Sequence, residues 1–390
     1  MKILIVSPIS IFPNTRGSTN RILELAKSLV KAGAEVFILH AGHSGTIKEG
    51  ISFFGYLSFA DLLGTKNVIG RFLDRNIGSF NIFSTRHMYS IVNKVQPDII
   101  QFEFPTIFGS PFNIWSKIPN AVKVLDEHNV ELLTAKSSSS VPYISPIKTG
   151  IEKRAVETAD LVLSVSEADK TTLIQLYSIP ENRVIVIPNG VNFKKYSSIN
   201  KYAARKKLGI EESAKIMFFH GTMSWRPNRE AVDMITSFIC PRVKSHCSEA
   251  TFFIAGEDSE TLYGHYSELD NGICILGFVD NLVDYIMASD ICIVPLISGG
   301  GTSLKMLEYM AAGKPIVTTK VGSRGLPIVD GEHAVIRNEL KNDFPEAIIK
   351  ILEIPEEEWI GNQARNLAFK YDWENMGQKL YSIYSRILIE

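Results

Sequence analysis

Short runs of β-branched and other apolar residues alternate with helix-length segments along this chain, and the alternation occurs twice. The first set of runs ends near residue 187, and a second set begins near residue 216. A short continuous apolar run predicts a strand that is buried on both faces, as strands of parallel sheets are. Strands that alternate with helices build βαβ units. The pattern therefore predicts two α/β domains, each with a doubly wound parallel sheet.

The linker between the two domains is predicted at Pro188–Asn192, a turn-forming segment. The strands expected before it are Ile3–Ser7, Glu35–Leu39, Asp98–Phe102, Val122–Asp126, Leu161–Val165 and Val184–Ile187. Those expected after it are Ile216–His220, Thr251–Ala255, Ile273–Leu276, Ile291–Val294 and Ile316–Thr318. We assign residues 1–190 to the first domain and 191–372 to the second, and expect the helical segment 373–390 to pack back on the first domain.

Composition excludes several other classes of protein. A chain of 390 residues exceeds what one hydrophobic core usually sustains, and its 21% of charged residues leaves too little polar excess for long disorder. The net charge of -1 offers no global field for nucleic acid. Four cysteines without Cys-x-x-Cys spacing predict no zinc site, and the lack of a long apolar stretch predicts a cytoplasmic protein.

The strongest motif is a glycine-rich loop that follows the predicted strand Ile291–Val294 and opens a helix. Glycines allow a ligand to approach the backbone, and the free N–H groups of a helix start favour an anion such as a diphosphate. Lys305 and Glu308 share one helix face, where the ammonium suits phosphate and the carboxylate suits ribose hydroxyls. The predicted donor-binding residues of this loop are Gly299, Gly300, Gly301, Thr302, Ser303 and Leu304, with Thr302 or Ser303 as the N-cap. An ordinary turn before a surface helix remains the alternative.

The stretch Leu307–Val317 (LEYMAAGKPIV) resembles a signature of the retaining GT-B glycosyltransferases of family 4, also called group 1. Weaker matches at Pro188–Val191 and Gly277–Val279 fall in the family's order, so the resemblance covers nearly the whole chain. It implies two facing Rossmann-like domains with a C-terminal helix that returns to the first. It also implies a hexosyltransferase that moves a sugar from a nucleotide-sugar donor to a glycan, lipid-linked or small-molecule acceptor, in polysaccharide or glycoconjugate biosynthesis.

The same resemblance assigns roles to single residues. Glu308 holds the ribose, Gly17 lies beside the donor phosphates, and His128 faces the donor sugar. We assign His128, Lys305 and Glu308 as catalytic residues. Gly221 and Arg226 are added to the donor-binding set, because they follow the first strand of the second domain.

The chain departs from the family pattern at two places. Gly300 occupies the position of the family's first motif glutamate, and Thr222 and Pro227 occupy those of an Arg and a Lys that clamp the pyrophosphate. We expect Lys305, with help from Arg226 or Arg229, to replace part of that clamp.

Acceptor-side residues are expected at the strand ends of the first domain. His128 directly follows the predicted strand Val122–Asp126, and Glu103 and Glu131 are candidates for contacts with an acceptor hydroxyl. The segment Asn67–Lys94 mixes basic and aromatic residues, which fits either peripheral contact with a membrane or a surface helix with its aromatic side chains packed inward.

Two other functions fit parts of the same pattern. A non-hydrolysing nucleotide-sugar epimerase shares the two-domain plan, and a catalytically silent nucleotide-sugar-binding protein fits the two departures. The chain contains no Gly-x-Gly-x-x-Gly after its first strand and no P-loop, which disfavours a dehydrogenase and an NTPase. It contains no Asp-x-Asp, so neither a metal nor another cofactor is predicted.

Overall fold

The computed structural model describes residues 1–12, 17–42, 45, 48–58, 61–62, 82–109, 118, 120–130, 145–264, 272–354 and 361–389. The chain forms two compact units, one of Met1–Asn189 with Trp373–Glu390 and one of Gly190–Asp372. The boundary falls one residue before the predicted one, within the turn-forming segment.

The first unit contains a seven-stranded parallel sheet in the order β3-β2-β1-β4-β5-β6-β7. Its strands are β1 (Lys2–Ser7), β2 (Glu35–Ala41), β3 (Ile51–Tyr56), β4 (Ile99–Glu103), β5 (Val122–Glu127), β6 (Leu161–Ser164) and β7 (Val184–Val186). Its helices are α1 (Gly17–Lys31), α4 (Ile82–Val95), α6 (Ser145–Thr158), α7 (Glu167–Tyr177) and α17 (Trp373–Ile387), with the 3₁₀ turns η1 (Pro105–Gly109) and η3 (Glu181–Arg183). The chain order reverses between β1 and β4, which makes the carboxyl ends of these strands the expected ligand-binding edge.

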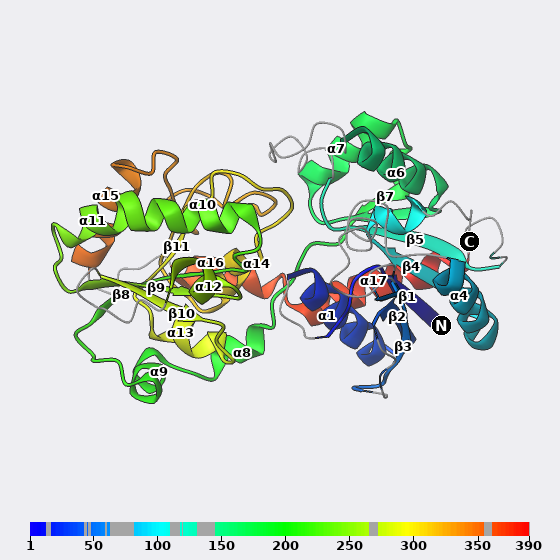
Figure 1. Ribbon diagram of the computed structural model, residues 1–390, viewed down its shortest axis with the longest axis horizontal. Helices are drawn as coiled ribbons and strands as arrows, with labels where there is room; N and C mark the ends of the chain where they lie inside the picture. The colour runs from blue at the N-terminus through cyan, green and yellow to red at the C-terminus, as the bar shows by residue number, and fades with distance from the viewer. Residues whose placement is uncertain are drawn as a thin grey trace. The chain divides into compact units, whose positions relative to one another are not determined.

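The C-terminal helix α17 packs against α1 in the first unit (Figure 1). The two helices approach closely at Gly377, where a Cβ atom would lie 2.2 Å from the Cβ of Ser28. A larger residue at position 377 would therefore separate them. The predicted return of the C-terminal helix to the first domain is confirmed.

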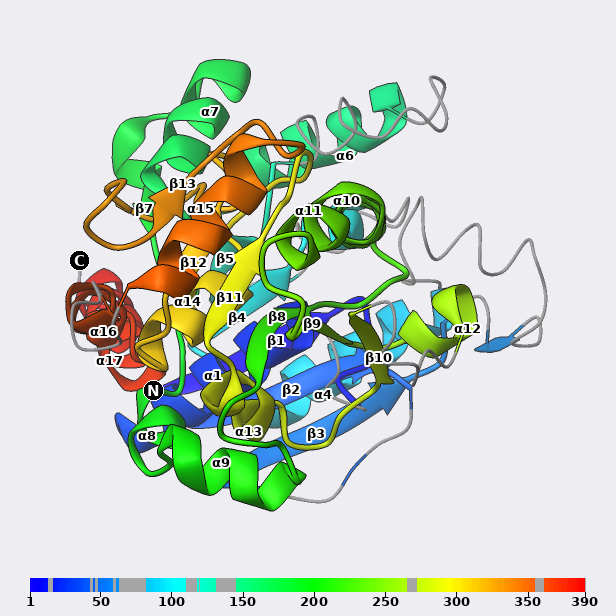
Figure 2. The ribbon, with the colours of Figure 1, turned by 90° about the vertical axis from the view of Figure 1, so that its left-hand side faces the viewer.

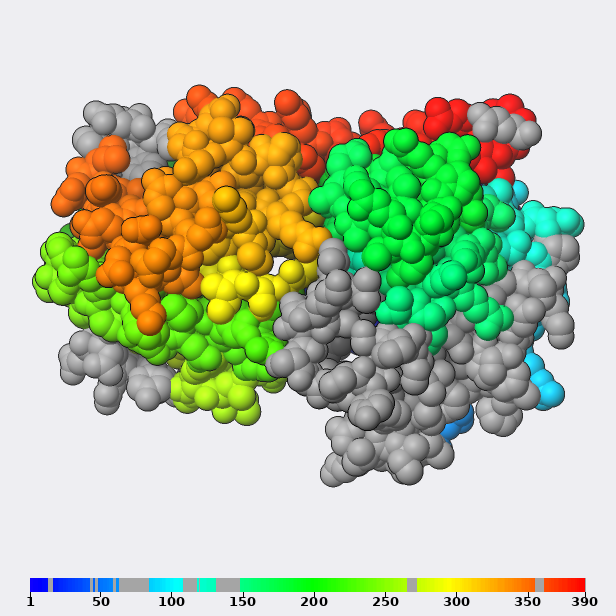
Figure 3. Space-filling view, turned by 90° about the horizontal axis from the view of Figure 1, so that it is seen from above, coloured from blue at the N-terminus to red at the C-terminus, as the bar shows by residue number. Residues whose placement is uncertain are grey.

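The second unit contains a six-stranded parallel sheet in the order β10-β9-β8-β11-β12-β13 (Figure 2). Its strands are β8 (Lys215–His220), β9 (Ala250–Ala255), β10 (Ile273–Gly277), β11 (Ile291–Val294), β12 (Ile316–Thr318) and β13 (Val335–Ile336). Its helices are α8 (Phe193–Ser197), α9 (Lys201–Leu208), α10 (Arg226–Met234), α11 (Cys240–Lys244), α12 (Ser259–Tyr263), α13 (Leu282–Ala288), α14 (Leu304–Ala311), α15 (Asp343–Glu353) and α16 (Gly361–Phe369). A π-helical turn, η4 (Ile235–Ile239), joins α10 to α11, and α11 lies beside α15 on the face shown in Figure 3.

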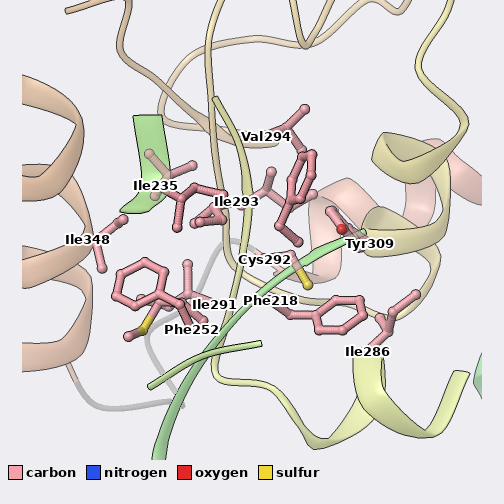
Figure 4. Close-up of a cluster of buried hydrophobic side chains, with 14 of the residues drawn as sticks. Phe218, Ile235, Phe252, Ile286, Ile291, Cys292, Ile293, Val294, Tyr309 and Ile348 are labelled. Carbon is pink, nitrogen blue, oxygen red and sulfur yellow. The ribbon is translucent and has the colours of Figure 1, made fainter. Parts of the chain in front are cut away.

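The core of the second unit lies on both faces of its central strand β11, whose four residues are buried. Ile293 points toward Ile235 and Ile348, whereas Cys292 points toward Tyr309 and Phe218 on the opposite face (Figure 4). Successive side chains of a strand alternate in direction, so a strand covered by helices on both faces must be apolar throughout. This is the pattern from which the parallel sheet was predicted.

Every strand predicted from the sequence is present, and two strands were not predicted. β3 lies at the edge of the first sheet and is only half buried. β13 has two residues, which is too short for a periodic pattern. Within the described ranges, no helix is both long and apolar enough to cross a membrane.

Candidate active site

The second unit places its candidate site at the carboxyl ends of β8 and β11, which are neighbours in the sheet. The chain order reverses between these strands, and open α/β sheets bind ligands at such a switch point. The loop 221–225 follows β8, and the loop 295–303 follows β11. Both of these loops run into helices, α10 and α14, that begin at the same edge.

Glycine is required at two positions of the loop after β11. The φ angles of Gly299 and Gly301 are +124° and +67°, in the left-handed region that residues with a side chain rarely adopt. A Cβ atom on Gly299 would also lie 3.0 Å from Cη2 of Trp225, whose indole is 41% exposed. At position 221 glycine is needed for a different reason, because a Cβ atom there would lie 2.4 Å from Asn228 Nδ2. The loop backbone and the Trp225 ring therefore lie in direct contact.

The helix α14 begins immediately after this loop, with Ser303 as the N-cap residue. Ser303 makes no side-chain capping hydrogen bond, so the first N–H groups of the helix lack the side-chain oxygen that usually accepts from them. Together with the helix dipole, these groups form a site that favours an anion. At the other end, Gly313 adopts φ +66° directly after the C-cap Ala312, a left-handed conformation that is typical of a helix end.

Lys305 is buried in the first turn of α14. Its Nζ donates a hydrogen bond of 2.8 Å to Asn228 Oδ1 and lies 4.1 Å from the ring centroid of Phe219. Desolvation lowers the pKa of Lys305 to about 7, and the nearby carboxylate of Glu308 opposes this shift. Asn228 in turn donates to the carbonyl of Thr222, so it connects Lys305 to the loop after β8. Sequence reasoning missed Asn228, which follows Pro227 at the start of α10.

Glu308 lies one turn further along α14 and faces His220, the last residue of β8. His220 Nε2 lies 3.0 Å from Glu308 Oε2, and the two side chains are 14% and 22% exposed. Sequence reasoning gave His220 no role, because nothing in the chain order shows that the end of β8 meets the middle of α14.

The two arginines expected to assist Lys305 are engaged with protein groups. Arg226 Nε donates to Glu230 Oε1 at 2.6 Å, and the other oxygen of Glu230 accepts a hydrogen bond from Ser298. Arg229 donates from Nη1 to the carbonyls of Met223 and Ser224 in the loop after β8. Both arginines thus hold the loops in place, and a contact with phosphate remains a prediction.

In the first unit, His128 follows β5 and contacts the end of β4. Its Nε2 lies 2.6 Å from Glu103 Oε2, and its ring packs against Phe104 with centroids 4.1 Å apart. Glu103 is fully buried and accepts a second hydrogen bond at Oε1 from Gln101. Burial and the neighbouring Asp126 raise the pKa of Glu103, whereas His128 opposes the shift. Because Glu103 is buried, its position favours a role in orienting His128 over the predicted contact with an acceptor hydroxyl.

Asp126 lies beside this pair and is held by Arg21 of α1. The guanidinium donates from Nε and Nη2 to the two carboxylate oxygens at 2.9 and 2.8 Å. Glu103, Asp126 and His128 offer ligand atoms within 4.8 Å of one another, an arrangement that suits a metal ion. Their hydrogen bonds to Arg21 and to each other already use these atoms, so we interpret the cluster as a polar network.

The remaining predicted residues are placed as follows. Gly17 is the first residue of α1 and is exposed. Thr302 is buried directly before Ser303. Glu131 and most of the segment Asn67–Lys94 lie outside the described residues, and their predicted contacts stay predictions.

Comparison with solved structures identifies the fold. The chain is similar to sucrose-phosphate synthase from Thermosynechococcus elongatus, with a TM-score of 0.80, 16% identity, and coverage of 100% of this chain and 99% of that one. It is also similar to Anabaena HepE in complex with UDP and glucose, with a TM-score of 0.72, 18% identity and 99% coverage of both chains. Two Rossmann-like units with a returning C-terminal helix define the GT-B fold, and this prediction is confirmed.

Comparison with families identifies the particular group. Residues 15–195 match the model described as Glycosyltransferase Family 4, and residues 214–353 match the one described as Glycosyl transferases group 1. A D-inositol 3-phosphate glycosyltransferase of Catenulispora acidiphila is 22% identical over 248 residues, 60% of this chain and 58% of the relative. An uncharacterized glycosyltransferase of Methanocaldococcus jannaschii is 26% identical over 251 residues, 61% of each chain. The matches span about six tenths of the relatives' length. This chain belongs to the family 4, or group 1, glycosyltransferases.

Proposed function

We propose that this protein transfers a glycosyl group from a nucleoside-diphosphate sugar to a hydroxyl of a glycan, lipid-linked or small-molecule acceptor. The observation that carries the proposal is the anion site at the start of α14. A glycine loop with two left-handed residues leads into a helix without a side-chain cap, at the switch point of a parallel sheet. Family membership and the UDP complexes of Anabaena HepE support the assignment of a nucleotide-sugar donor.

In this proposal the second unit binds the donor. The diphosphate lies against the first N–H groups of α14, and Glu308 accepts hydrogen bonds from ribose hydroxyls. Cleavage of the donor increases negative charge on the leaving diphosphate, and fixed donors at that position stabilise the transition state. Lys305 contributes a positive charge when protonated, and its pKa of about 7 allows a bound phosphate to shift it to the charged form.

The stereochemical course follows from family membership in this proposal. The acceptor attacks the face that the diphosphate leaves, the anomeric configuration is retained, and the departing phosphate accepts the acceptor proton. No protein base is then needed, and we propose a reaction without a metal ion. His128 is proposed to donate a hydrogen bond to the donor sugar.

A donor panel tests the proposal. The purified protein is incubated with UDP-, GDP-, ADP- and dTDP-sugars, and melting temperature and release of nucleoside diphosphate are measured. A ligand that binds the folded state raises the melting temperature. We expect one nucleotide class to raise it and to be slowly hydrolysed, at a rate unchanged by EDTA.

The other outcomes separate the alternatives. A changed sugar without release of nucleoside diphosphate would identify an epimerase, and saturable binding without turnover would identify a silent binding protein. If no nucleotide sugar raises the melting temperature or is turned over, the proposed function is wrong.

A further inference from the structure

The contact between His220 and Glu308 joins the end of β8 to the middle of α14. The distance from His220 Nε2 to Glu308 Oε2 is 3.0 Å. This is the distance of an ion pair, but its geometry is not that of a hydrogen bond, and within the described residues Nε2 is a buried nitrogen without a hydrogen-bond partner.

The imidazole ring is fixed by its neighbours. It stacks on Phe218 with centroids 5.9 Å apart and meets Tyr309 edge-on at 5.4 Å. The backbone N–H of His220 donates to the Tyr309 hydroxyl at 3.2 Å. Phe218 and Tyr309 are both fully buried, and the close-up of the core shows them on the same face of β11 (Figure 4). A ring held on two sides presents its Nε2 in one direction.

Glu308 depends on this contact for its orientation. Lys305, its neighbour on the helix face, is turned to Asn228 and does not hold the carboxylate. Within the described part of the chain, Glu308 Oε1 has no hydrogen-bond or ion-pair partner, while Oε2 lies 3.0 Å from His220 Nε2. The contact with the imidazole therefore limits where one oxygen can lie, and the other oxygen is left for a ligand. Fixing a glutamate before binding removes the entropy cost of ordering it on the ligand.

We propose that His220 is a positioning residue for recognition of the nucleotide ribose. It holds Glu308 so that the free oxygen accepts a hydrogen bond from a ribose hydroxyl. The inference rests on the proposed donor site, and it makes one specific claim beyond it. The contribution of a ribose hydroxyl to affinity depends on the imidazole, although His220 itself does not touch the ligand.

Two matched substitutions test this dependence. His220→Gln places an amide N–H near the position of Nε2, whereas His220→Asn is one methylene shorter and does not reach Glu308. Both are polar and smaller than histidine, so their effects on folding should be similar, and melting temperatures check this. Affinities for UDP, 2′-deoxy-UDP and 3′-deoxy-UDP are measured by calorimetry for both variants and the unaltered protein, or with another base if the donor panel selects one.

We expect removal of the contacted hydroxyl to weaken binding about tenfold in the unaltered protein, the scale of one hydrogen bond to a charged group. In His220→Asn this penalty should fall to about twofold, because the carboxylate is no longer held, and His220→Gln should restore much of it. Residues that couple through a shared contact show such non-additivity.

The two hypotheses fail in different ways. If Glu308→Ala weakens UDP binding but His220→Asn keeps the full hydroxyl penalty, His220 only packs in the core and the positioning role is wrong. If Glu308→Ala leaves UDP binding unchanged, the ribose contact itself is wrong, and the role of His220 falls with it.

Discussion

Lys305 Nζ and Asn228 Oδ1 form a hydrogen bond of 2.8 Å between two buried side chains, one on α14 and one on α10. The immediate partners of the ammonium are the neutral amide oxygen of Asn228 and the face of Phe219. The carboxylate that raises its pKa is that of Glu308. Burial with so little compensation explains why the pKa of Lys305 falls to about 7. A phosphate would supply the missing negative charge.

Donor affinity should therefore depend on pH. Above pH 7 the free protein loses the Lys305 proton, and binding of a diphosphate must recover it. We expect UDP affinity to fall between pH 7 and pH 9 and binding to take up a proton, measured by calorimetry in buffers of different ionisation enthalpy. Lys305→Met should abolish the proton uptake, and uptake that persists in this variant would contradict the assignment.

Burial of Lys305 makes the free energy of unfolding depend on pH in the sense opposite to that of a lysine in an ion pair. In the unfolded chain Lys305 keeps its proton up to about pH 10.5, whereas the folded protein releases it above about pH 7. Between these values the unfolded state binds more protons, so this residue makes the free energy of unfolding rise with pH. Urea titrations at pH 6.5 and 9 measure the free energy of unfolding of the unaltered protein and of Lys305→Met. The difference between the two proteins should be smaller at pH 9 than at pH 6.5.

Removing Lys305 should also slow the reaction. If the ammonium stabilises the leaving diphosphate, Lys305→Met should lose about 2 to 4 kcal/mol of transition-state stabilisation, seen in kcat/KM. Lys153→Met is the matched control, because that lysine lies on α6 of the first unit, where it is exposed and pairs with Glu157. Equal small effects of both substitutions would show that Lys305 does not act on phosphate.

Gly299→Ala should impair the glycine loop without unfolding the protein. The new Cβ would require a left-handed φ and would push against the indole of Trp225. We expect KM for the donor to rise about tenfold, with a melting temperature within a few degrees of the original. Gly331→Ala carries a comparable positive φ in open space and should leave KM unchanged.

His128 and Glu103 should act as a unit. Glu103→Gln keeps the shape of the side chain but replaces the charged acceptor of the His128 contact, whose atoms lie 2.6 Å apart. We expect kcat to fall about 10- to 100-fold in Glu103→Gln and in His128→Ala, and the double substitution to cost little more than either alone. Additive losses would show that the two residues act independently.

The Arg21–Asp126 pair should be important for stability. Both side chains are buried. Arg21 also donates to the carbonyl of Pro188 and to Oδ1 of Asn189, the last residue of the segment Met1–Asn189 in the first unit. Asp126→Ala leaves a buried guanidinium without its partner, which typically costs about 3 to 5 kcal/mol. Urea unfolding followed by tryptophan fluorescence measures this loss. A change below about 1 kcal/mol would mean that water or another acceptor replaces the carboxylate.

The unpredicted strand β3 shows where sequence patterns fail. Only nine residues separate it from β2, its parallel partner, so the alternation of strand and helix-length segment is missing there. It lies at the sheet edge, and three of its six residues are only partly buried. Its sequence therefore lacks the unbroken apolar run that is typical of a fully buried strand. The central strands were predictable because burial on both faces demands unbroken apolar runs.

The sequence by itself determined the two-sheet architecture, the linker region, the glycine loop with its helix, and the family. These features are local, since periodicity, turn chemistry and helix caps are properties of neighbouring residues. Tertiary structure alone decided which side chains meet. His220 and Glu308 are 88 positions apart, and Lys305 and Asn228 are 77 apart. Each pair forms because β8 and β11 are neighbours in the sheet, and that pairing depends on how the whole unit buries its apolar surface.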